Sequence, residues 1–117
     1  MGLSTHVLDS MHGAPALGMQ VALYRTSENT ATLLQQVTLN KDGRPPQGML
    51  IAHTDLEVGT YRLVFEVAPY FRALGVALPE PHFLSDVVLD FGVAYADQHY
   101  HVPLVVSPWS YSTYRGS

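Results

Sequence analysis

The sequence predicts an all-β sandwich or barrel of antiparallel strands that carries one short helix. Short segments rich in Val, Leu, Tyr, Phe and Thr alternate with Gly, Pro, Asn and Asp along the whole chain, and this rhythm is typical of such folds. The chain has 117 residues, which is close to the commonest size of one domain. We therefore expect residues 1–117 to form a single domain, with no internal repeat or linker.

Four strands are expected in the first half of the chain, at residues 3–9, 19–26, 33–39 and 50–53. Residues 12–15 contain Gly and Pro and are interpreted as a turn. Residues 40–43 form a second turn, in which Asp42-Gly43 supplies the positive φ that a tight turn requires.

The second half begins with a strand at residues 60–67, where Tyr61, Leu63, Phe65 and Val67 share one face and Arg62 and Glu66 are among the residues on the other. Pro69 in a first helical position and a stopping Gly75 predict about two turns of helix at residues 69–75. Residues 75–83 contain two prolines, Pro79 and Pro81, and are expected to be a loop. Further strands are predicted at residues 86–95, 100–106 and 109–114.

Composition excludes several classes of protein. The chain has no cysteine, so disulfides, thiol catalysis and thiolate metal sites are excluded. The net charge is −4 and the six basic residues are scattered singly, which argues against nucleic-acid binding. Residues 1–12 contain neither a basic residue nor an apolar block, so we expect no secretion signal and a cytoplasmic location.

The apolar content is high for so short a chain, at 47% hydrophobic residues against 14% charged residues. The longest apolar run, at residues 102–106, is far shorter than the ~20 residues that a membrane helix needs. Association with copies of the same chain explains the composition better than contact with a membrane.

Three patches contain residues that are able to do chemistry. His6 lies within an early strand, Arg44 follows a tight turn, and His99 and His101 lie two residues apart and so share one face of a strand. Each has a simpler explanation: a half-buried structural histidine, a solvated turn residue and a polar strand face, respectively. The two spaced histidines with His6 also fit a zinc site that activates water, with Asp97 as a residue that could orient the rings.

The C-terminal residues Tyr114-Arg115-Gly116-Ser117 are unusual for a chain end. Ordinary termini are polar and frayed, whereas two tyrosines and an arginine occur in the last seven residues here. This composition predicts that the terminus is docked on the protein, although a strand that happens to end the chain is the alternative.

The chain resembles the 5-hydroxyisourate hydrolases, transthyretin-like enzymes of urate degradation. The final Tyr-Arg-Gly-Ser is the most specific feature, and His-Tyr-His-Val-Pro-Leu precedes it at residues 99–104. The resemblance extends to Leu-Ser-Thr-His-Val-Leu-Asp at residues 3–9, to Asp-Gly-Arg at 42–44, and to Gly-Thr-Tyr-Arg-Leu-Val-Phe at 59–65. Transthyretins are also similar at residues 110–113, but they continue into a longer tail and lack these histidines.

The resemblance implies a two-sheet β-sandwich of about eight strands and a homotetramer built as a dimer of dimers, with active sites where the dimers meet. It implies hydrolysis of 5-hydroxyisourate to 2-oxo-4-hydroxy-4-carboxy-5-ureidoimidazoline without a cofactor or metal. Transthyretin-type binding of a small ligand and a zinc-dependent hydrolase remain the alternatives.

The resemblance also implies roles for individual residues. The catalytic residues would be His6, Arg44, His101 and Ser117, and the substrate-binding residues would be His6, Arg44, Tyr114 and Arg115. One of the two histidines would activate water, and the division of roles between them stays open. His99 belongs to the motif but is given less weight. Two departures are Val105-Val106 in place of a leucine pair and Pro45-Pro46 after Arg44, which could shift the arginine.

Overall fold

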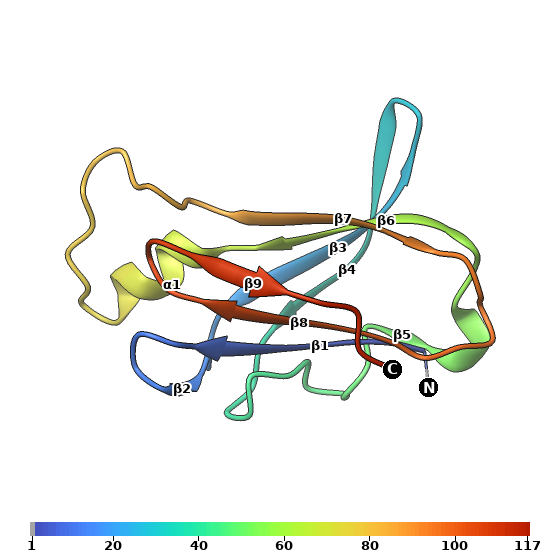
Figure 1. Ribbon diagram of the computed structural model, residues 1–117, viewed down its shortest axis with the longest axis horizontal. Helices are drawn as coiled ribbons and strands as arrows, with labels where there is room; N and C mark the ends of the chain where they lie inside the picture. The colour runs from blue at the N-terminus through green and yellow to red at the C-terminus, as the bar shows by residue number, and fades with distance from the viewer. Residues whose placement is uncertain (1) are drawn as a thin grey trace.

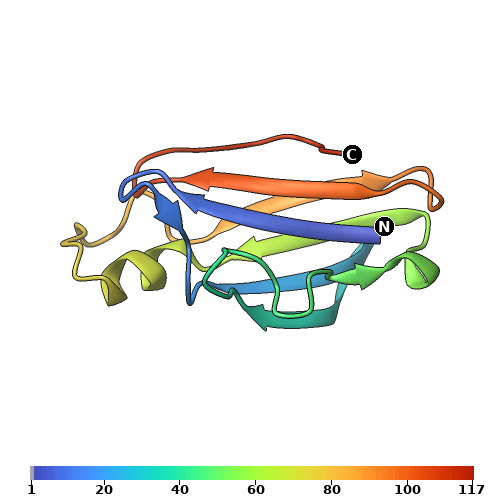
Figure 2. The same cartoon turned by 90° about the horizontal axis from the view of Figure 1, so that it is seen from below.

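The computed structural model describes residues 2–117 and shows two β-sheets packed face to face, with helix α1 (Val67–Ala73) at one end (Figure 1). Met1, where the expected domain begins, lies outside the described residues. The view from below in Figure 2 shows the two layers, with β1 and β8 in one and β3 and β4 in the other. An all-β sandwich was predicted, and that prediction is confirmed.

The first sheet has the strand order β2-β1-β8-β9, and β5 pairs with the same edge of β1 as β2 does. Its two central strands are β1 (Gly2–Asp9) and β8 (Tyr100–Val106), which run parallel to each other. The shorter strands at its margins are β2 (Ala14–Pro15), β5 (Ile51–Ala52) and β9 (Tyr111–Thr113).

The second sheet has the order β4-β3-β6-β7, and all of its neighbouring strands are antiparallel. Its strands are β3 (Gln20–Ser27), β4 (Thr30–Thr38), β6 (Gly59–Phe65) and β7 (Val87–Val93). The 3-10 helix η1 (His53–Asp55) follows β5. None of the helices among residues 2–117 is long and apolar enough to span a membrane.

The hydrophobic core lies between the inner faces of the two sheets. Leu3 and Val7 of β1 and Leu63 and Phe65 of β6 are completely buried there, because alternate residues of a strand point to opposite faces. Phe71 of α1 is also fully buried and belongs to the same core cluster. The burial of each such side chain stabilises the folded state by about 1.5–3 kcal/mol.

The predicted antiparallel arrangement is wrong for the centre of the first sheet. β1 and β8 pair in parallel, from Leu3 opposite Tyr100 to Asp9 opposite Val106. The alternation of side chains in a strand has the same period in parallel and antiparallel pairs, so this pattern gives no information about direction. A parallel pair also needs a long connection between its strands, and here that connection is almost the whole chain.

Several element boundaries differ from the prediction. Residues 14–15, expected to be part of a turn, pair with Leu8 and Asp9 as β2. The strand expected at residues 50–53 ends at Ala52 and gives way to η1. The final strand is limited to Tyr111–Thr113, because residues 107–110 form a turn closed by the bond from Ser107 N to Ser110 O.

Helix α1 begins at Val67, two residues before the predicted start, so Val67 is not the last residue of the preceding strand. Pro69 occupies the third helical position, and this is tolerated because the first N–H groups of a helix have no intrahelical acceptor. The alternation predicted for the preceding strand is confirmed, since Tyr61, Leu63 and Phe65 are all buried.

A buried carboxylate joins the end of β1 to α1. Asp9 is completely buried and accepts hydrogen bonds from the hydroxyl of Tyr70 at 2.8 Å and from the backbone N–H of His12 at 3.0 Å, while the His12 ring lies at 2.6 Å. Burial raises the pKa of Asp9, but these hydrogen bonds outweigh it and the pKa is lowered. Burial and the bond to Asp9 raise the pKa of Tyr70 well above its usual value. The tyrosine therefore stays a neutral donor.

We predict that Asp9→Asn destabilises the fold by about 1–3 kcal/mol, because the donors of His12 and Tyr70 lose the charged acceptor that Asp9 supplies at a buried position. Since the pKa of Asp9 is lowered, its contribution should be present above the unfolded-state pKa of about 3.9 and be lost as the pH falls through the folded value. Urea unfolding as a function of pH measures this. Asp90→Asn, which removes an exposed ion pair with Arg62, is the control and should change little. Equal effects of both variants would contradict the prediction.

Candidate functional site

The outer face of the first sheet, directed away from the core, carries the histidines singled out in the sequence. Because Leu3 and Val7 point into the core, the alternating residues Ser4 and His6 of β1 lie on the opposite face. The parallel register places Ser4 beside His101 of β8 and His6 beside Pro103. His6 and His101 are both half-buried. The fold thus gathers on one face side chains from opposite ends of the chain.

Arg44 reaches this face because its turn is docked on β1. Val7 N donates to Gly43 O at 2.9 Å, and the Asn40 side chain accepts the backbone N–H of Arg44 at 3.1 Å. Gly43 has φ of 72°, and a Cβ at this position would lie 2.5 Å from Val7 O. Only glycine fits both the backbone conformation and this close approach. Pro45 is buried after the turn, so the unusual Pro45-Pro46 is compatible with a docked Arg44.

Burial and the Arg44 charge act together on the two histidines. Burial lowers the pKa of His6 and the positive charge of Arg44 lowers it further, while a hydrogen bond to the Asp42 backbone opposes the shift. Burial lowers the pKa of His101 as well, followed by the charges of Arg44, His6 and His99. Both rings are therefore neutral at pH 7 and lie near a permanent cation.

The C-terminal segment is docked beside His101, as predicted. Gly116 N donates to His101 O at 2.6 Å, and His101 N donates to Gly116 O at 3.1 Å. A Cβ on Gly116 would lie 3.1 Å from Cβ and 3.3 Å from Cδ2 of His101. The segment therefore packs against the Cδ2 edge of the His101 ring.

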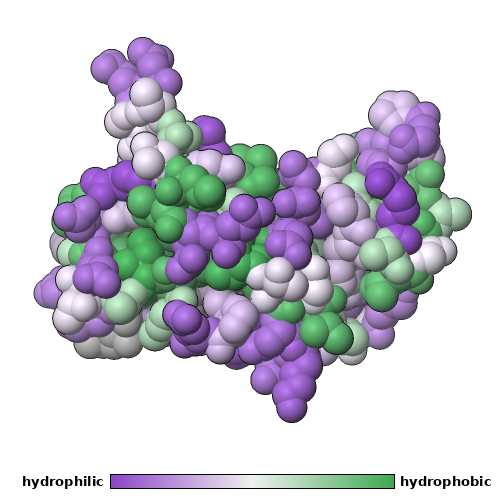
Figure 3. Space-filling model, turned by 180° about the vertical axis from the view of Figure 1, so that it is seen from behind, coloured by the Kyte–Doolittle hydropathy of each residue, from purple (hydrophilic) through white to green (hydrophobic). Residues whose placement is uncertain are grey.

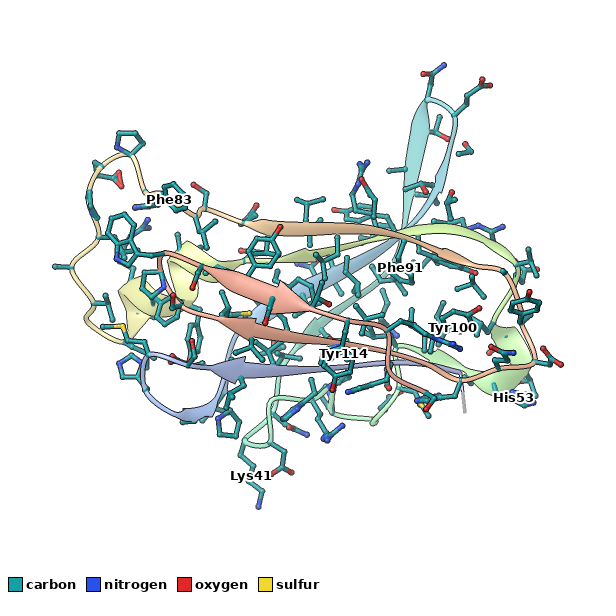
Figure 4. All side chains as sticks on the ribbon, viewed as in Figure 1. Lys41, His53, Phe83, Phe91, Tyr100 and Tyr114 are labelled. Carbon is teal, nitrogen blue, oxygen red and sulfur yellow. The ribbon has the colours of Figure 1, made fainter. Side chains whose placement is uncertain are left out.

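The other residues of the final tetrapeptide differ in their surroundings. The Arg115 guanidinium lies 4.1 Å from the ring centroid of Tyr100 and donates to the carbonyl of His99 at 3.0 Å, so it anchors the segment to the start of β8. Tyr114 is 66% exposed, and Figure 4 shows it on the terminal segment in front of β8. Ser117 is exposed at the chain end.

Ser4 and His99 complete the cluster. From the sequence, His99 was given less weight than His101. Ser4 Oγ lies 2.7 Å from Nδ1 of His101 and 3.2 Å from Nε2 of His99. Ser4 was not singled out, although its spacing of two from His6 places both on one face of β1. Its position opposite His101 depends on the register between distant strands.

Two grooves of the structure are lined by residues other than His6, Arg44 and His101. A groove of about 740 Å³ is lined by β4, β5 and η1 and includes Arg25 and Glu57. A second groove, of about 420 Å³, lies between β7 and the C-terminal segment and is lined in part by Phe91, Tyr100 and Tyr114, which Figure 4 labels. Within residues 2–117, no group of three or more His, Cys, Asp or Glu side chains is arranged to hold a metal ion.

The structure thus brings His6, Arg44 and His101 together with the C-terminal segment, and Tyr114 and Arg115 lie alongside. The outer face offers neutral imidazoles that can exchange protons with water or substrate, next to a guanidinium that can hold a substrate oxygen. The catalytic and binding roles assigned from the sequence remain predictions.

The sequence matches one protein family over nearly the whole chain. The model of the HIUase/Transthyretin family matches residues 3–116. A 5-hydroxyisourate hydrolase of Pseudomonas aeruginosa is 54% identical over 115 residues, which cover 98% of this chain and 90% of that protein.

Solved structures agree with the sequence comparison. The 5-hydroxyisourate hydrolase of Klebsiella pneumoniae matches with a TM-score of 0.82 and 32% identity, covering 99% of this chain and 98% of that one. A structure of (S)-allantoin synthase matches with a TM-score of 0.92 and 42% identity. In that comparison 99% of this chain is covered, but the chain spans only 43% of the longer protein.

We predict that Gly43→Ala displaces the Arg44 turn from β1. Gly48→Ala is the matched control, because Gly48 has a similar φ of 85° but nothing within 4 Å of the added Cβ. Alanine at 43 should cost about 1–3 kcal/mol more in unfolding free energy than alanine at 48. NMR titration should show the pKa of His6 rising as the Arg44 charge moves away, and an unchanged pKa of His6 would contradict the prediction.

Proposed function

Because the chain belongs to the HIUase/Transthyretin family, we propose that it hydrolyses 5-hydroxyisourate to 2-oxo-4-hydroxy-4-carboxy-5-ureidoimidazoline. The observation that carries the proposal is the outer-face cluster, in which His6, Arg44 and His101 meet the docked C-terminal segment. The high identity to a 5-hydroxyisourate hydrolase over nearly the whole chain supports the same substrate.

The reaction needs an activated water and a partner for the charge that develops on a carbonyl oxygen. A neutral imidazole is suited to take a proton from water near pH 7, and the lowered pKa values keep His6 and His101 neutral. Arg44 holds a substrate oxygen through its fork of donors. Tyr114 contacts the substrate, Arg115 holds the C-terminal segment beside the substrate through Tyr100 and His99, and Ser117 orients a histidine or the water. The steps require no cofactor or metal.

We further propose that residues 1–117 act as one domain of a homotetramer, a dimer of dimers in which the outer sheet faces of two dimers enclose the sites. His6 and His101 lie on an outer face, and acyl hydrolysis benefits from the exclusion of bulk water. Large apolar side chains are exposed next to this sheet, among them Leu17 (61%), Trp109 (59%) and Tyr111 (44%). Exposed apolar groups of this kind support contact with another copy.

The direct test is the decay of freshly generated 5-hydroxyisourate, followed by ultraviolet absorbance. The protein should accelerate the decay, and exhaustive chelation should leave the rate unchanged. His6→Asn should lower kcat by about 10²-fold or more, because a general acid or base is lost. His53→Asn, which replaces an exposed histidine of η1 outside the cluster, should not.

Each alternative has its own outcome in this assay. Activity that disappears with chelator and returns with zinc would establish the zinc-dependent hydrolase. Binding of thyroid hormone without hydrolysis would establish a transthyretin-type carrier. Full activity of His6→Asn would remove His6 from the reaction.

We predict that a peptide fused after Ser117 lowers kcat/KM by at least about tenfold, since small displacements of positioned groups reduce rates strongly. The same peptide inserted between Glu28 and Asn29 is the control. That site is the exposed tip of the β3–β4 hairpin, which protrudes as a polar point in Figure 3, and insertion there should leave kcat/KM unchanged. A fully active C-terminal fusion would show that the free terminus is not required.

A further inference from the structure

The Ser4 hydroxyl links two histidine rings on the proposed catalytic face. Its Oγ lies within hydrogen-bond distance of His101 Nδ1 and of His99 Nε2, at 2.7 and 3.2 Å, and Ser4 is only 5% exposed. A serine hydroxyl has one proton to donate and two lone pairs with which to accept. It can therefore donate to one of these nitrogens while it accepts a proton from the other.

His99 decides the direction of this pair of hydrogen bonds. Its Nδ1 is buried and has no hydrogen-bond partner among the described residues. A proton on that nitrogen would be a buried unsatisfied donor, which costs about 1–3 kcal/mol. The proton of neutral His99 consequently lies on Nε2, where Ser4 Oγ accepts it. The Ser4 proton is then donated to His101 Nδ1, so neutral His101 carries its own proton on Nε2.

His6 is the second imidazole of the outer face. It lies two residues from Ser4 along β1, while Ser4 Oγ lies within hydrogen-bond distance of the rings of His99 and His101. A neutral imidazole has one bare nitrogen that can take a proton. Since the nitrogen that His101 leaves for a substrate is a protonated donor, His6 is the ring that remains to act as the base.

Resting on the proposed function, we propose that Ser4 is a positioning residue that makes His101 the hydrogen-bond donor of the site and leaves His6 as the base. His6 removes a proton from water as the water oxygen bonds to the substrate carbonyl carbon. The resulting oxyanion accepts the Nε2–H of His101 together with Arg44. When the C–N bond of the ring breaks, the leaving nitrogen takes the proton from His6, and His101 keeps its proton throughout.

The arrangement of His101 favours this role over proton uptake. Burial and the charge of Arg44 lower the pKa of His101, so an imidazolium is disfavoured and the ring stays a neutral donor. The Gly116 backbone packs against Cδ2, the carbon bonded to Nε2. The donor therefore points toward the part of the face that the C-terminal segment borders.

Nitrogen-15 NMR of histidine-labelled full-length protein tests the tautomer directly. Two-bond proton–nitrogen correlations at pH 7.5 should show His101 with a protonated Nε2 and a bare Nδ1. Ser4→Ala removes the donor to Nδ1, so a population protonated at Nδ1 should appear. Ser10→Ala is the control, because its hydroxyl bonds to Val106 O on the same strand pair and contacts neither histidine. A wild-type His101 protonated at Nδ1 would overturn the proposal.

Kinetics test the division of roles. Glutamine places an amide N–H near the position of Nε2, so His101→Gln should retain kcat within about tenfold of the wild type. The shorter His101→Asn and the base-deficient His6→Gln should each fall by about 10²-fold or more. His101→Gln as inactive as His6→Gln would overturn the assignment of His6 as the base.

These readouts separate the inference from the proposed function. A wild-type protein that does not hydrolyse 5-hydroxyisourate would disprove the function, and the NMR tautomer would still decide whether Ser4 orients His101. If Ser4→Ala fails to fold, His99→Gln replaces it. Glutamine can donate or accept toward Ser4, so His101 should then lose its single tautomer, and a single retained tautomer would overturn the role of His99.

Discussion

The parallel pairing of β1 with β8 is the constraint on which the rest of the structure depends. It joins segments about as far apart as the chain allows, with Thr5 Oγ1 donating to Val102 O at 2.7 Å across 97 positions. The edge of β1 that faces away from β8 pairs with β2 and β5, and the edge of β8 that faces away from β1 pairs with β9. The closure of so long a loop is costly in entropy, and the fully buried side chains of both strands offset that cost.

The two faces of this strand pair have separate functions. The inner face supplies apolar core residues such as Val7 and Leu104, both fully buried. The outer face carries Ser4, His6 and His101. A slip of one residue would exchange the faces of either strand. Stability and the proposed chemistry therefore depend on the same register.

Two non-regular segments complete the outer face by binding to the edges of these strands. The turn that ends at Arg44 is held on β1 through Val7, and the C-terminal segment is held on β8 through Gly116. Both attachments use backbone hydrogen bonds and a glycine at a close approach, where a Cβ would lie 2.5 Å from Val7 O at Gly43 and 3.1 Å from the His101 Cβ at Gly116. Burial lowers the pKa of both His6 and His101, and the Arg44 charge lowers it further, so the docked turn helps to keep both rings neutral.

The sequence by itself determined what depends on neighbouring residues. Alternation identified the buried face of Tyr61, Leu63 and Phe65, and Asp42-Gly43 marked the turn before Arg44. The composition of the last residues indicated a docked terminus. Only the tertiary structure decided the parallel direction of β1 and β8 and the contacts of Ser4 with His99 and His101. Local periodicity tells which way a side chain faces, but the partner and direction of a strand follow from packing between distant segments.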